Sequence, residues 1–477
     1  MKIFRLANVA LRHFLKVPAA DTPTLSSVRT RETSFRNLIY CVTEMALLLL
    51  VFVPMPSSSG GFETIKQTTL VNDSGSSRYC ITKAKKGGYL IAGDRNILAG
   101  PIDLYKVDSN GQVLWHQLIV GTKLAWQFAK TVFEDEDGSI LVGGTSNSLD
   151  LVGEHWEKDT SNRANVYKNA PSAALLAKFD SRGKLLWKKA YGRIERRKRS
   201  EFYRGIKVSD GYMLIGYMTG TKHPAGPPAR EIPFAAIWIV KVTKSGEVQW
   251  ERTLEVDQGS TIYTTLDEHD LSPIQIDSVG NIVFAAAVGI DLSDSRHELE
   301  TTVDPVKNGR VLIFKFDKNG NELARQRLPR KSHPSLIKNG NEYVLLRNLR
   351  GEGGDGIHSV RFGEDLSIVS DRTISARTFF LRAAIPGIDG GSYLLGQYLP
   401  PSTERGFAMI AYLPKEGGIR DETTLTSRLL LFSSLTSWKF LSSSIDVARG
   451  ESSDEIAALW HPTQNRELRL SILKLKH

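Results

Sequence analysis

One short element recurs along this chain: a turn, usually containing glycine, followed by a short apolar strand. Its seven copies have turn positions 88, 138, 211, 280, 340, 391 and 453, so neighbouring copies lie 50 to 73 residues apart. They read GYLIAG, GSILVGG, GYMLIGY, GNIVFAA, GNEYVLL, GSYLLGQ and DEIAALW. Between the copies the residues mostly alternate with period two, which indicates strands rather than helices. Self-similarity at this spacing is typical of a ring or stack of equal units, so the fold must be built from seven of them.

A second element follows each of the first four copies: a strand, a tight turn with Asp, Asn or Ser near glycine, and a further strand. It reads LYKVDSNGQVLW at 104–115, AKFDSRGKLLW at 177–187, VKVTKSGEVQW at 240–250 and FKFDKNGNELA at 314–324. Glycine supplies the positive φ that a twisted hairpin requires. Trp115, Trp187 and Trp250 each stand four residues after the turn glycine, and Ala324 replaces the tryptophan in the fourth copy. The lysine that precedes each turn is expected to point outward from the strand.

The two ends of the chain complete one another. Residues 468–477, LRLSILKLKH, match the strand before the tight turn and then stop, whereas residues 65–70, IKQTTL, resemble the strand after it. Pairing the two would close a ring and remove the exposed sheet edge. The sequence therefore predicts an all-β, seven-bladed β-propeller over residues 61–477, with an N-terminal strand closing the last blade. Roughly 415 residues over seven blades gives about 60 each, enough for four strands and their loops.

The hairpin pattern KxDxxGxxxW, followed by GGYLIAG-like strands, resembles the β-propeller repeats of exported prokaryotic proteins. It is similar to the tryptophan-docking repeats of the quinoprotein-like (PQQ-like) propeller superfamily. The resemblance implies that Trp115, Trp187 and Trp250 bridge neighbouring blades, and replacing one with alanine is expected to cost about 3–5 kcal/mol, as for other buried aromatics. It also implies a less regular ring from Ala324 onward. The adjacent cysteine pair of the quinone-dependent dehydrogenases is missing from this sequence, which holds only Cys41 and Cys80, and we expect no cofactor.

The first sixty residues have a different character. A basic leader over residues 1–36, expected to be disordered, precedes an apolar segment at 37–56 and a run of small residues. This order is typical of a secretory signal, and the stretch 37–55 is about long enough to span a bilayer as an anchor. Basic residues on its N-terminal side place the propeller outside the cytoplasm. We therefore expect a periplasmic or extracellular protein, either secreted or anchored in the membrane.

Two segments resemble functional motifs, but each is better explained as a turn between strands. GEGGDG at 351–356 fits the dinucleotide fingerprint, but an alternating, strand-like segment follows where a helix is required. The acidic run at 134–137 occupies the turn position of a repeat and lacks the ligands of a calcium loop. The 10 histidines are scattered without metal-ligand spacing. We therefore assign no catalytic and no metal-ligating residue.

Three segments of repeats two and three carry binding potential. The basic run 193–199 supplies the candidate binding residues Arg193, Arg196, Arg197, Lys198 and Arg199. Two insertions, 149–170 and 218–233, are loops of the length that binding sites use. An exported protein with a net charge of +10 favours anionic glycans, envelope components or proteins as partners over nucleic acid.

These observations favour a non-catalytic binding or scaffold propeller of the cell envelope or extracellular space, recognising a protein or glycan through the loops of repeats two and three. A hydrolase or lyase with its site in the central channel is the alternative. A cell-envelope assembly factor that holds a membrane protein with its blade edges or its top face is a third hypothesis, which overlaps the first. Binding of an extended peptide along a blade edge would distinguish it from glycan binding. Paired carboxylates at the channel mouth would favour the enzyme, and apolar side chains filling the channel would oppose it.

Overall fold

The computed structural model describes the strands of the repeat region and the turns between them. The described residues are 61–71, 79–94, 100–121, 127–152, 172–192, 199–222, 232–254, 271–288, 310–329, 332–349, 356–375, 379–387, 390–398, 407–415, 446–452, 454–460 and 468–476. The basic leader and the apolar segment 37–56 lie outside them, as do most of the insertions 149–170 and 218–233.

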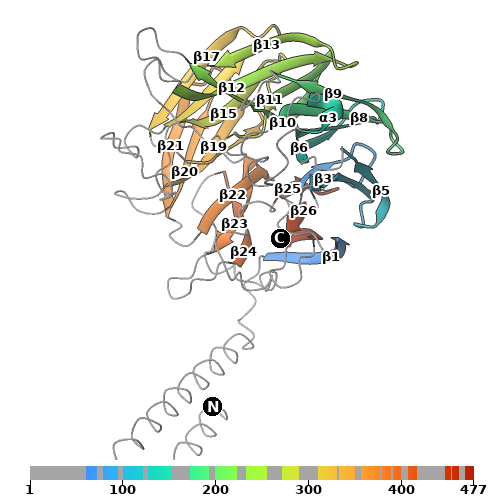
Figure 1. Ribbon diagram of the computed structural model, residues 1–477. Coiled ribbons are helices and arrows are strands. Elements are labelled where there is room, and N and C mark those ends of the chain that lie inside the picture. Colours follow the sequence, from blue (N-terminus) through green and yellow to red (C-terminus); the bar gives the residue numbers. More distant parts are fainter. Residues whose placement is uncertain are drawn as a thin grey trace, which may run out of the picture. The chain divides into compact units, whose positions relative to one another are not determined.

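Within these residues the strands form seven antiparallel sheets, the blades of a β-propeller (Figure 1). Blade 1 contains β2 (Tyr79–Lys83), β3 (Tyr89–Asp94), β4 (Ile102–Val107) and β5 (Val113–Ile119). Blade 2 contains β6 (Gln127–Glu134), β7 (Ile140–Ser146), β8 (Ala173–Phe179) and β9 (Leu185–Tyr191). Blade 3 contains β10 (Ser200–Val208), β11 (Gly211–Lys222), β12 (Ile232–Thr243) and β13 (Val248–Leu254).

The remaining blades continue in chain order. Blade 4 contains β14 (Gln275–Ile276), β15 (Ile282–Val288), β16 (Arg310–Phe316) and β17 (Glu322–Pro329). Blade 5 contains β18 (Pro334–Asn339), β19 (Glu342–Leu349), β20 (Gly356–Phe362) and β21 (Ile368–Ser375). Blade 6 has three described strands, β22 (Phe379–Pro386), β23 (Ser392–Tyr398) and β24 (Phe407–Leu413). Blade 7 contains β25 (Asp446–Arg449), β26 (Glu455–Trp460), β27 (Leu468–Lys476) and β1 (Gly61–Val71).

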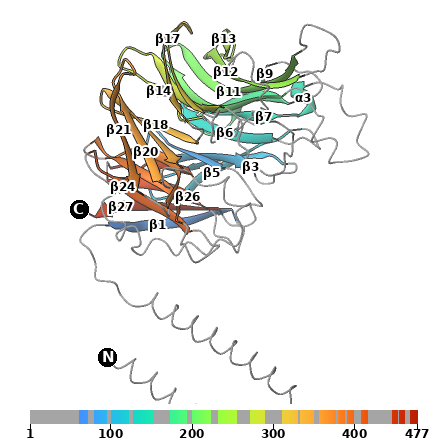
Figure 2. The same ribbon diagram turned by 90° about the vertical axis from the view of Figure 1, so that its left-hand side faces the viewer.

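Blade 7 is assembled from both ends of the propeller sequence. Strand β1 pairs antiparallel with β27 from Gly61 opposite Lys476 to Val71 opposite Leu468, and Figure 2 shows the two strands side by side. The predicted closure of the ring by an N-terminal strand is thus confirmed. The prediction of a strand rather than a helix after GEGGDG is also confirmed, because Ile357 and the residues after it belong to β20.

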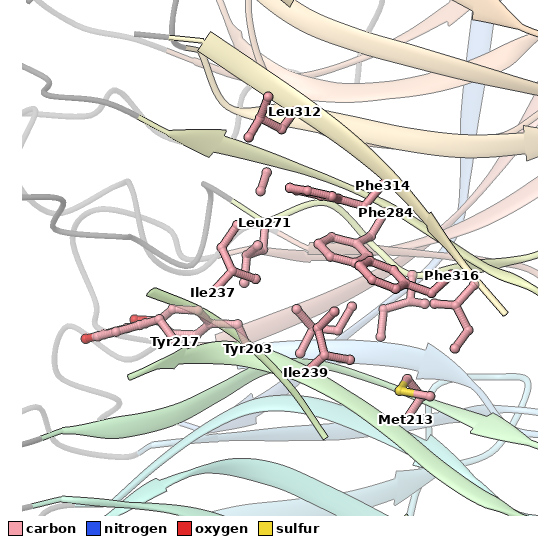
Figure 3. Packing of buried hydrophobic residues seen from close by; sticks show 14 of the residues in the cluster. Tyr203, Met213, Tyr217, Ile237, Ile239, Leu271, Phe284, Leu312, Phe314 and Phe316 are labelled. Atoms are coloured by element: carbon pink, nitrogen blue, oxygen red, sulfur yellow. The ribbon is translucent and has the colours of Figure 1, made fainter. Parts of the chain in front are cut away.

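The hydrophobic core consists of the seams between blades. The buried apolar side chains described here form seven clusters, and each cluster joins two neighbouring blades, including blade 7 with blade 1. Figure 3 shows the seam of blades 3 and 4, where Phe284, Phe314 and Phe316 pack against Met213 and Ile239. Each blade is therefore covered on both of its sheet faces.

The meander within each blade gives the ring two different faces. Turns between a blade's first and second strands, and between its third and fourth, lie at one end, which we call the tight-turn face. In the turn after β4, for example, the Gly111 amide donates to the Asp108 carbonyl, and Gly111 has a φ of 75°. Connections from second to third strands, and from one blade to the next, lie at the opposite end, which we call the long-loop face.

Candidate functional site

The segments predicted to bind a partner all leave the ring on the long-loop face. The first insertion follows β7 and precedes β8, and the basic run lies between β9 and β10. The second insertion was expected to be a loop, but both of its ends are strand, because residues 218–222 belong to β11 and residues 232–233 to β12. Blades 2 and 3 are neighbours and share one apolar cluster. The three segments therefore leave from one sector of one face.

Two described elements extend this sector. Strands β11 and β12 have 12 residues each and pair throughout, from Gly211 opposite Thr243 to Lys222 opposite Ile232. The short helix α3 (Leu149–Val152) follows β7, and the Ser148 carbonyl accepts a hydrogen bond from the Leu151 amide at its start. Blade 3 thus continues as a paired ribbon where blade 1 has strands of only 6 residues at the matching place.

Of the predicted basic run, Arg199 is described, whereas Arg193, Arg196, Arg197 and Lys198 lie outside the described residues. Arg199 is half-buried and forms an isolated parallel bridge with Ser172, just ahead of β10. Burial raises the pKa of the nearby Tyr217, and the Arg199 charge partly opposes this shift. The basic run therefore ends at a bridge that joins the segment before β8 of blade 2 to the segment before β10 of blade 3.

Each predicted docking tryptophan lies against the turn glycine of the following blade. A Cβ atom built on Gly183 would lie 3.1 Å from the Trp115 ring, and one built on Gly246 or Gly320 would lie 2.9 Å from Trp187 or Trp250. The Trp250 indole N–H also donates to the Lys318 carbonyl at 3.2 Å. All three tryptophans are half-buried rather than buried, so we now expect each Trp→Ala change to cost less than the loss of a fully buried aromatic.

In the fourth copy, which has alanine in place of tryptophan, a leucine of the next blade fills the space that the indole ring fills elsewhere. Ala324 pairs with Lys315 in the register in which Trp250 pairs with Lys241. In the next blade, Leu366 occupies the turn position of the glycines and has a φ of 65°. Its side chain is fully buried, in a cluster against which Ala324 packs. The small residue at 324 is thus matched by a large one at 366, which explains how this seam closes without tryptophan.

The lysines before the tight turns point into the seams, so the expectation that they point outward is wrong. Lys178 donates to the Tyr212 hydroxyl at 2.9 Å and lies 3.8 Å from Asp135, while Lys315 lies 2.8 Å from Asp277. Period-two alternation does put these lysines on the face opposite their apolar neighbours, but in a propeller the adjacent blade covers that face as well.

The acidic run at 134–137 belongs to these seams. Asp135 is buried and accepts a hydrogen bond from the Tyr212 hydroxyl at 2.6 Å. Burial alone would raise the pKa of Asp135, but this bond and one from the backbone outweigh it and lower the pKa. The Asp135 amide donates to the Ser139 carbonyl and the Gly138 amide to the Asp135 carbonyl, so this run forms the turn between β6 and β7. Among the described residues no group of His, Cys, Asp and Glu is arranged to hold a metal ion.

Two blades carry an imidazole–carboxylate pair at the same positions with the partners exchanged. In blade 1, Asp103 lies 2.6 Å from His116 and accepts a hydrogen bond from Tyr79 at 3.0 Å. In blade 5, at the matching register, His358 lies 2.5 Å from Asp371. Both pairs join a third strand to a fourth strand, away from the ring axis, which indicates a role in holding the outer strands.

Charged and polar groups also gather at the axis of the ring, where the first strands of the blades meet. The charges of Asp446 on β25, Lys130 on β6 and Arg204 on β10 all act on the Cys80 thiol on β2. These residues come from blades 7, 2, 3 and 1. Each of these residues lies on the first strand of its blade, and the first strands of neighbouring blades contact one another.

A shared backbone irregularity places the axial cations. Strands β6, β10 and β22 each have a β-bulge opposite a glycine of the second strand, between Ala129 and Thr131, between Phe202 and Arg204, and between Leu381 and Ala383. A bulge inserts one residue and redirects the neighbouring side chain. Here the bulges include Lys130 and Arg382 and adjoin Arg204. Sequence reasoning did not single out Lys130, Arg204 or Arg382, because an inserted residue interrupts the period-two alternation of a strand.

Comparison with known proteins adds two distant structural likenesses. No family model matches the chain, and no curated protein matches it. A gluconolactonase from Xanthomonas campestris is 9% identical, with 89% of this chain and 97% of that chain covered and a TM-score of 0.35. Drosophila Semaphorin 2a is 7% identical, with 88% and 76% covered and a TM-score of 0.46. At these identities and TM-scores neither likeness informs what this chain binds or does.

In the described part of the chain, no helix is long and apolar enough to cross a bilayer. The segment 37–55, expected to be a signal or anchor, lies outside that part.

Proposed function

We propose that this propeller is an exported, non-catalytic binding or scaffold protein of the cell envelope or extracellular space. It recognises an anionic glycan or a protein through the long-loop face of blades 2 and 3. The observation that carries the proposal is that two insertions and the basic run all leave from one sector of one face, beside the extended β11–β12 ribbon. Loops mounted on a rigid scaffold are the usual location of binding sites.

The opposite face offers less freedom for binding. Its turns are tied to the neighbouring blade through Trp–Gly contacts and lysine–carboxylate pairs, as at Gly320 and Asp277. Changes in those turns would therefore disturb a seam. The first insertion, on the long-loop face, joins β7 and β8, which are already buried within blade 2, so its sequence can vary to suit a partner without opening a seam.

Heparin, as an anionic polymer probe, tests the charge component of this recognition. The full chain is applied to heparin–agarose and eluted with increasing salt, beside the double variant Arg196→Ala/Arg197→Ala. We expect this variant to elute at clearly lower salt, because each lost cation reduces the number of counterions displaced on binding.

A matched control lies in the same blade at the other face. Arg182 and Lys184 are exposed residues of the tight turn after β8, so Arg182→Ala/Lys184→Ala removes the same charge there and should elute with the unmodified chain. Equal losses in both variants would show a dependence on net charge alone and would contradict a site on the long-loop face.

Export is tested separately by intact mass and fractionation in the native host. A mass lacking roughly the first 60 residues in a soluble exported fraction supports a secreted propeller, and a full-length mass in membranes supports an anchored one. A full-length cytosolic product would contradict export.

An enzyme with an axial site is the alternative, and the polar, partly exposed groups at the axis favour it. Hydrolysis of glycosides uses two carboxyl groups facing one bond. Among the described groups whose charges act on Cys80, Asp446 is the carboxylate, and its oxygens accept bonds from the backbone amides of Ile81 and Val447. Binding is therefore the function that the contacts support better.

A further inference from the structure

Arginine side chains from two neighbouring blades face one seam at its outer strands. In blade 4, Arg325 of β17 lies directly opposite Phe314 of β16, and two residues further along Arg327 lies opposite Leu312. Phe314 and Leu312 both belong to the apolar cluster of blades 3 and 4. Residues directly opposite each other in an antiparallel pair share one face of the sheet, so both arginines point toward blade 3. The Arg325 guanidinium lies over the Phe314 ring at 4.8 Å, which agrees with this direction.

Blade 3 contributes a third arginine from the other side of the same seam. Arg252 of β13 lies directly opposite Ile239, a member of that apolar cluster. Its neighbours on the same face of β13, Trp250 and Leu254, pack against the cluster as well, so Arg252 points toward blade 4. The Arg252 guanidinium lies over the Trp250 ring at 5.7 Å and donates to the Glu251 carbonyl at 2.9 Å. Neither contact involves a carboxylate.

One of these three arginines is neutralised by a carboxylate. Glu322 accepts two hydrogen bonds from Arg325, at 2.8 and 2.7 Å. Arg252 and Arg327 form no ion pair with the described residues, and all three arginines are exposed. Burial, and next the charges of Arg327 and Arg325, lower the pKa of the buried Arg310 on the same face of blade 4, which agrees with like charges lying close together. Positive charge therefore exceeds negative charge among these groups.

The seam of blades 2 and 3 shows the opposite arrangement at the same positions. Lys189 of β9 stands two residues after its blade's tryptophan, as Arg252 does, and forms an ion pair with Glu247 of blade 3. In blade 4 the residue directly after the turn glycine, which is Glu247 in blade 3, is the neutral Asn321. Opposite charges thus attract across one seam, whereas like charges face each other across the next. The second arrangement leaves positive charge that an added anion can meet.

We propose that the outer seam of blades 3 and 4 binds a linear polysaccharide that carries carboxylate or sulfate groups. A guanidinium presents parallel N–H donors that match two oxygens of one such group. Arg325 and Arg327 lie about 7 Å apart along β17, so a chain with repeated anionic groups can meet both of them and Arg252. Arg252 and Arg327 provide the main contacts, because Glu322 already neutralises Arg325. The choice of polysaccharide over nucleic acid rests on the export proposed above.

Isothermal titration of the full chain with a heparin hexasaccharide and with a galacturonate hexasaccharide, each at several salt concentrations, tests this site. We expect saturable binding of at least one probe. Arg252→Gln/Arg327→Gln should weaken it about 5- to 30-fold, as for two lost exposed ion pairs, and should flatten its salt dependence. Arg182→Gln/Lys184→Gln removes the same charge from an exposed tight turn of blade 2 and should leave the affinity unchanged. Lack of saturable binding, or equal losses in both double variants, would overturn the proposal.

Glu322→Gln tests the site by a gain of binding, which damage to the fold would not produce. This variant releases Arg325 from its ion pair, so it should bind the hexasaccharide more tightly. Glu247→Gln is the matched control, because it removes a carboxylate from the ion pair with Lys189 in the neighbouring seam and should gain less. Equal gains would show a response to net charge alone and contradict a site in this seam. Tighter binding of a deoxythymidine oligonucleotide than of either hexasaccharide would overturn the choice of ligand.

The same titration separates the seam from the long-loop face. Loss of hexasaccharide binding in Arg196→Ala/Arg197→Ala, together with unchanged binding in Arg252→Gln/Arg327→Gln, would place the ligand on the long-loop face. That result would overturn the seam site and leave the proposed function intact. The reverse result would support the seam site and contradict the role of the basic run.

Discussion

The seam of blades 4 and 5 has Ala324 and Leu366 where the preceding seams have tryptophan and glycine. This difference allows a quantitative prediction of stability. Leu366 is fully buried and holds a φ of 65°, where the preceding blades have glycine. Leu366→Gly relieves a backbone strain of about 1 kcal/mol and loses a buried side chain worth about 2–5 kcal/mol. We expect a net destabilisation of about 2–3 kcal/mol.

The substitution Ala324→Trp should also destabilise the protein, but by overpacking the seam instead of leaving a cavity. Ala324→Trp forces an indole into space that the Leu366 side chain already fills, and overpacking of this kind costs about 1–3 kcal/mol. The double variant Ala324→Trp/Leu366→Gly rebuilds the contact seen between Trp250 and Gly320. It should therefore recover most of the loss, with a coupling energy of about 3 kcal/mol between the two sites.

Urea unfolding followed by far-ultraviolet circular dichroism measures all four proteins without depending on the number of tryptophans. The converse pair provides the matched control. Gly320→Leu should strongly destabilise the unmodified chain, because Trp250 lies 2.9 Å from the position of the new Cβ. The same substitution should destabilise the Trp250→Ala variant less. Additive losses in Ala324→Trp/Leu366→Gly would refute the idea that the two residues fill one space.

Three further outcomes follow from the seams. Trp250→Ala should destabilise by about 2 kcal/mol in urea unfolding, because its ring is half-buried; an unchanged midpoint would contradict the docking role. The pKa of Asp210, and despite burial that of Asp277, lies below the ordinary value because of lysine hydrogen bonds. The stability that these two carboxylates contribute is fully present above the unfolded carboxylate pKa of about 4 and is lost as the pH falls through the lower folded pKa. The urea concentration at the unfolding midpoint should therefore decrease when the pH is lowered below 4. Burial raises the pKa of Tyr212 and Tyr343, so stability should fall above about pH 10, where unfolded tyrosine ionises; equal midpoints at pH 8 and 11 would contradict this.

Those features of the ring that repeat locally could be predicted from the sequence. The seven apolar segments become second strands, from β3 to β26, and the incomplete hairpin at the C-terminus finds its partner in β1. Glycine turns and period-two alternation depend on residues close in the chain, so one copy already reveals the pattern. Closure then follows from the two unmatched ends.

The surroundings of individual side chains could not be predicted in this way. Lys178 was expected to point outward because alternation alone does not show that a second sheet covers the other face. Leu366 gave no signal as a turn residue at positive φ, because its partner, Ala324, belongs to another blade. Lys130 and Arg204 adjoin or lie in bulges, and an inserted residue interrupts the alternation on which strand prediction depends.

The difference between the two faces follows from the same packing. A tight turn such as that of Gly320 contacts the neighbouring blade, so added length there would separate a seam. The connection from β7 to β8, on the long-loop face, joins two strands already buried within their blade, and doubling the length of such a loop costs only about 0.6 kcal/mol of closure entropy. Length can therefore vary on one face without loss of the ring, as it does between β7 and β8 and between β11 and β12. The chemistry that distinguishes this propeller from others should accordingly be sought on that face and at the axis, and not in the repeated turns.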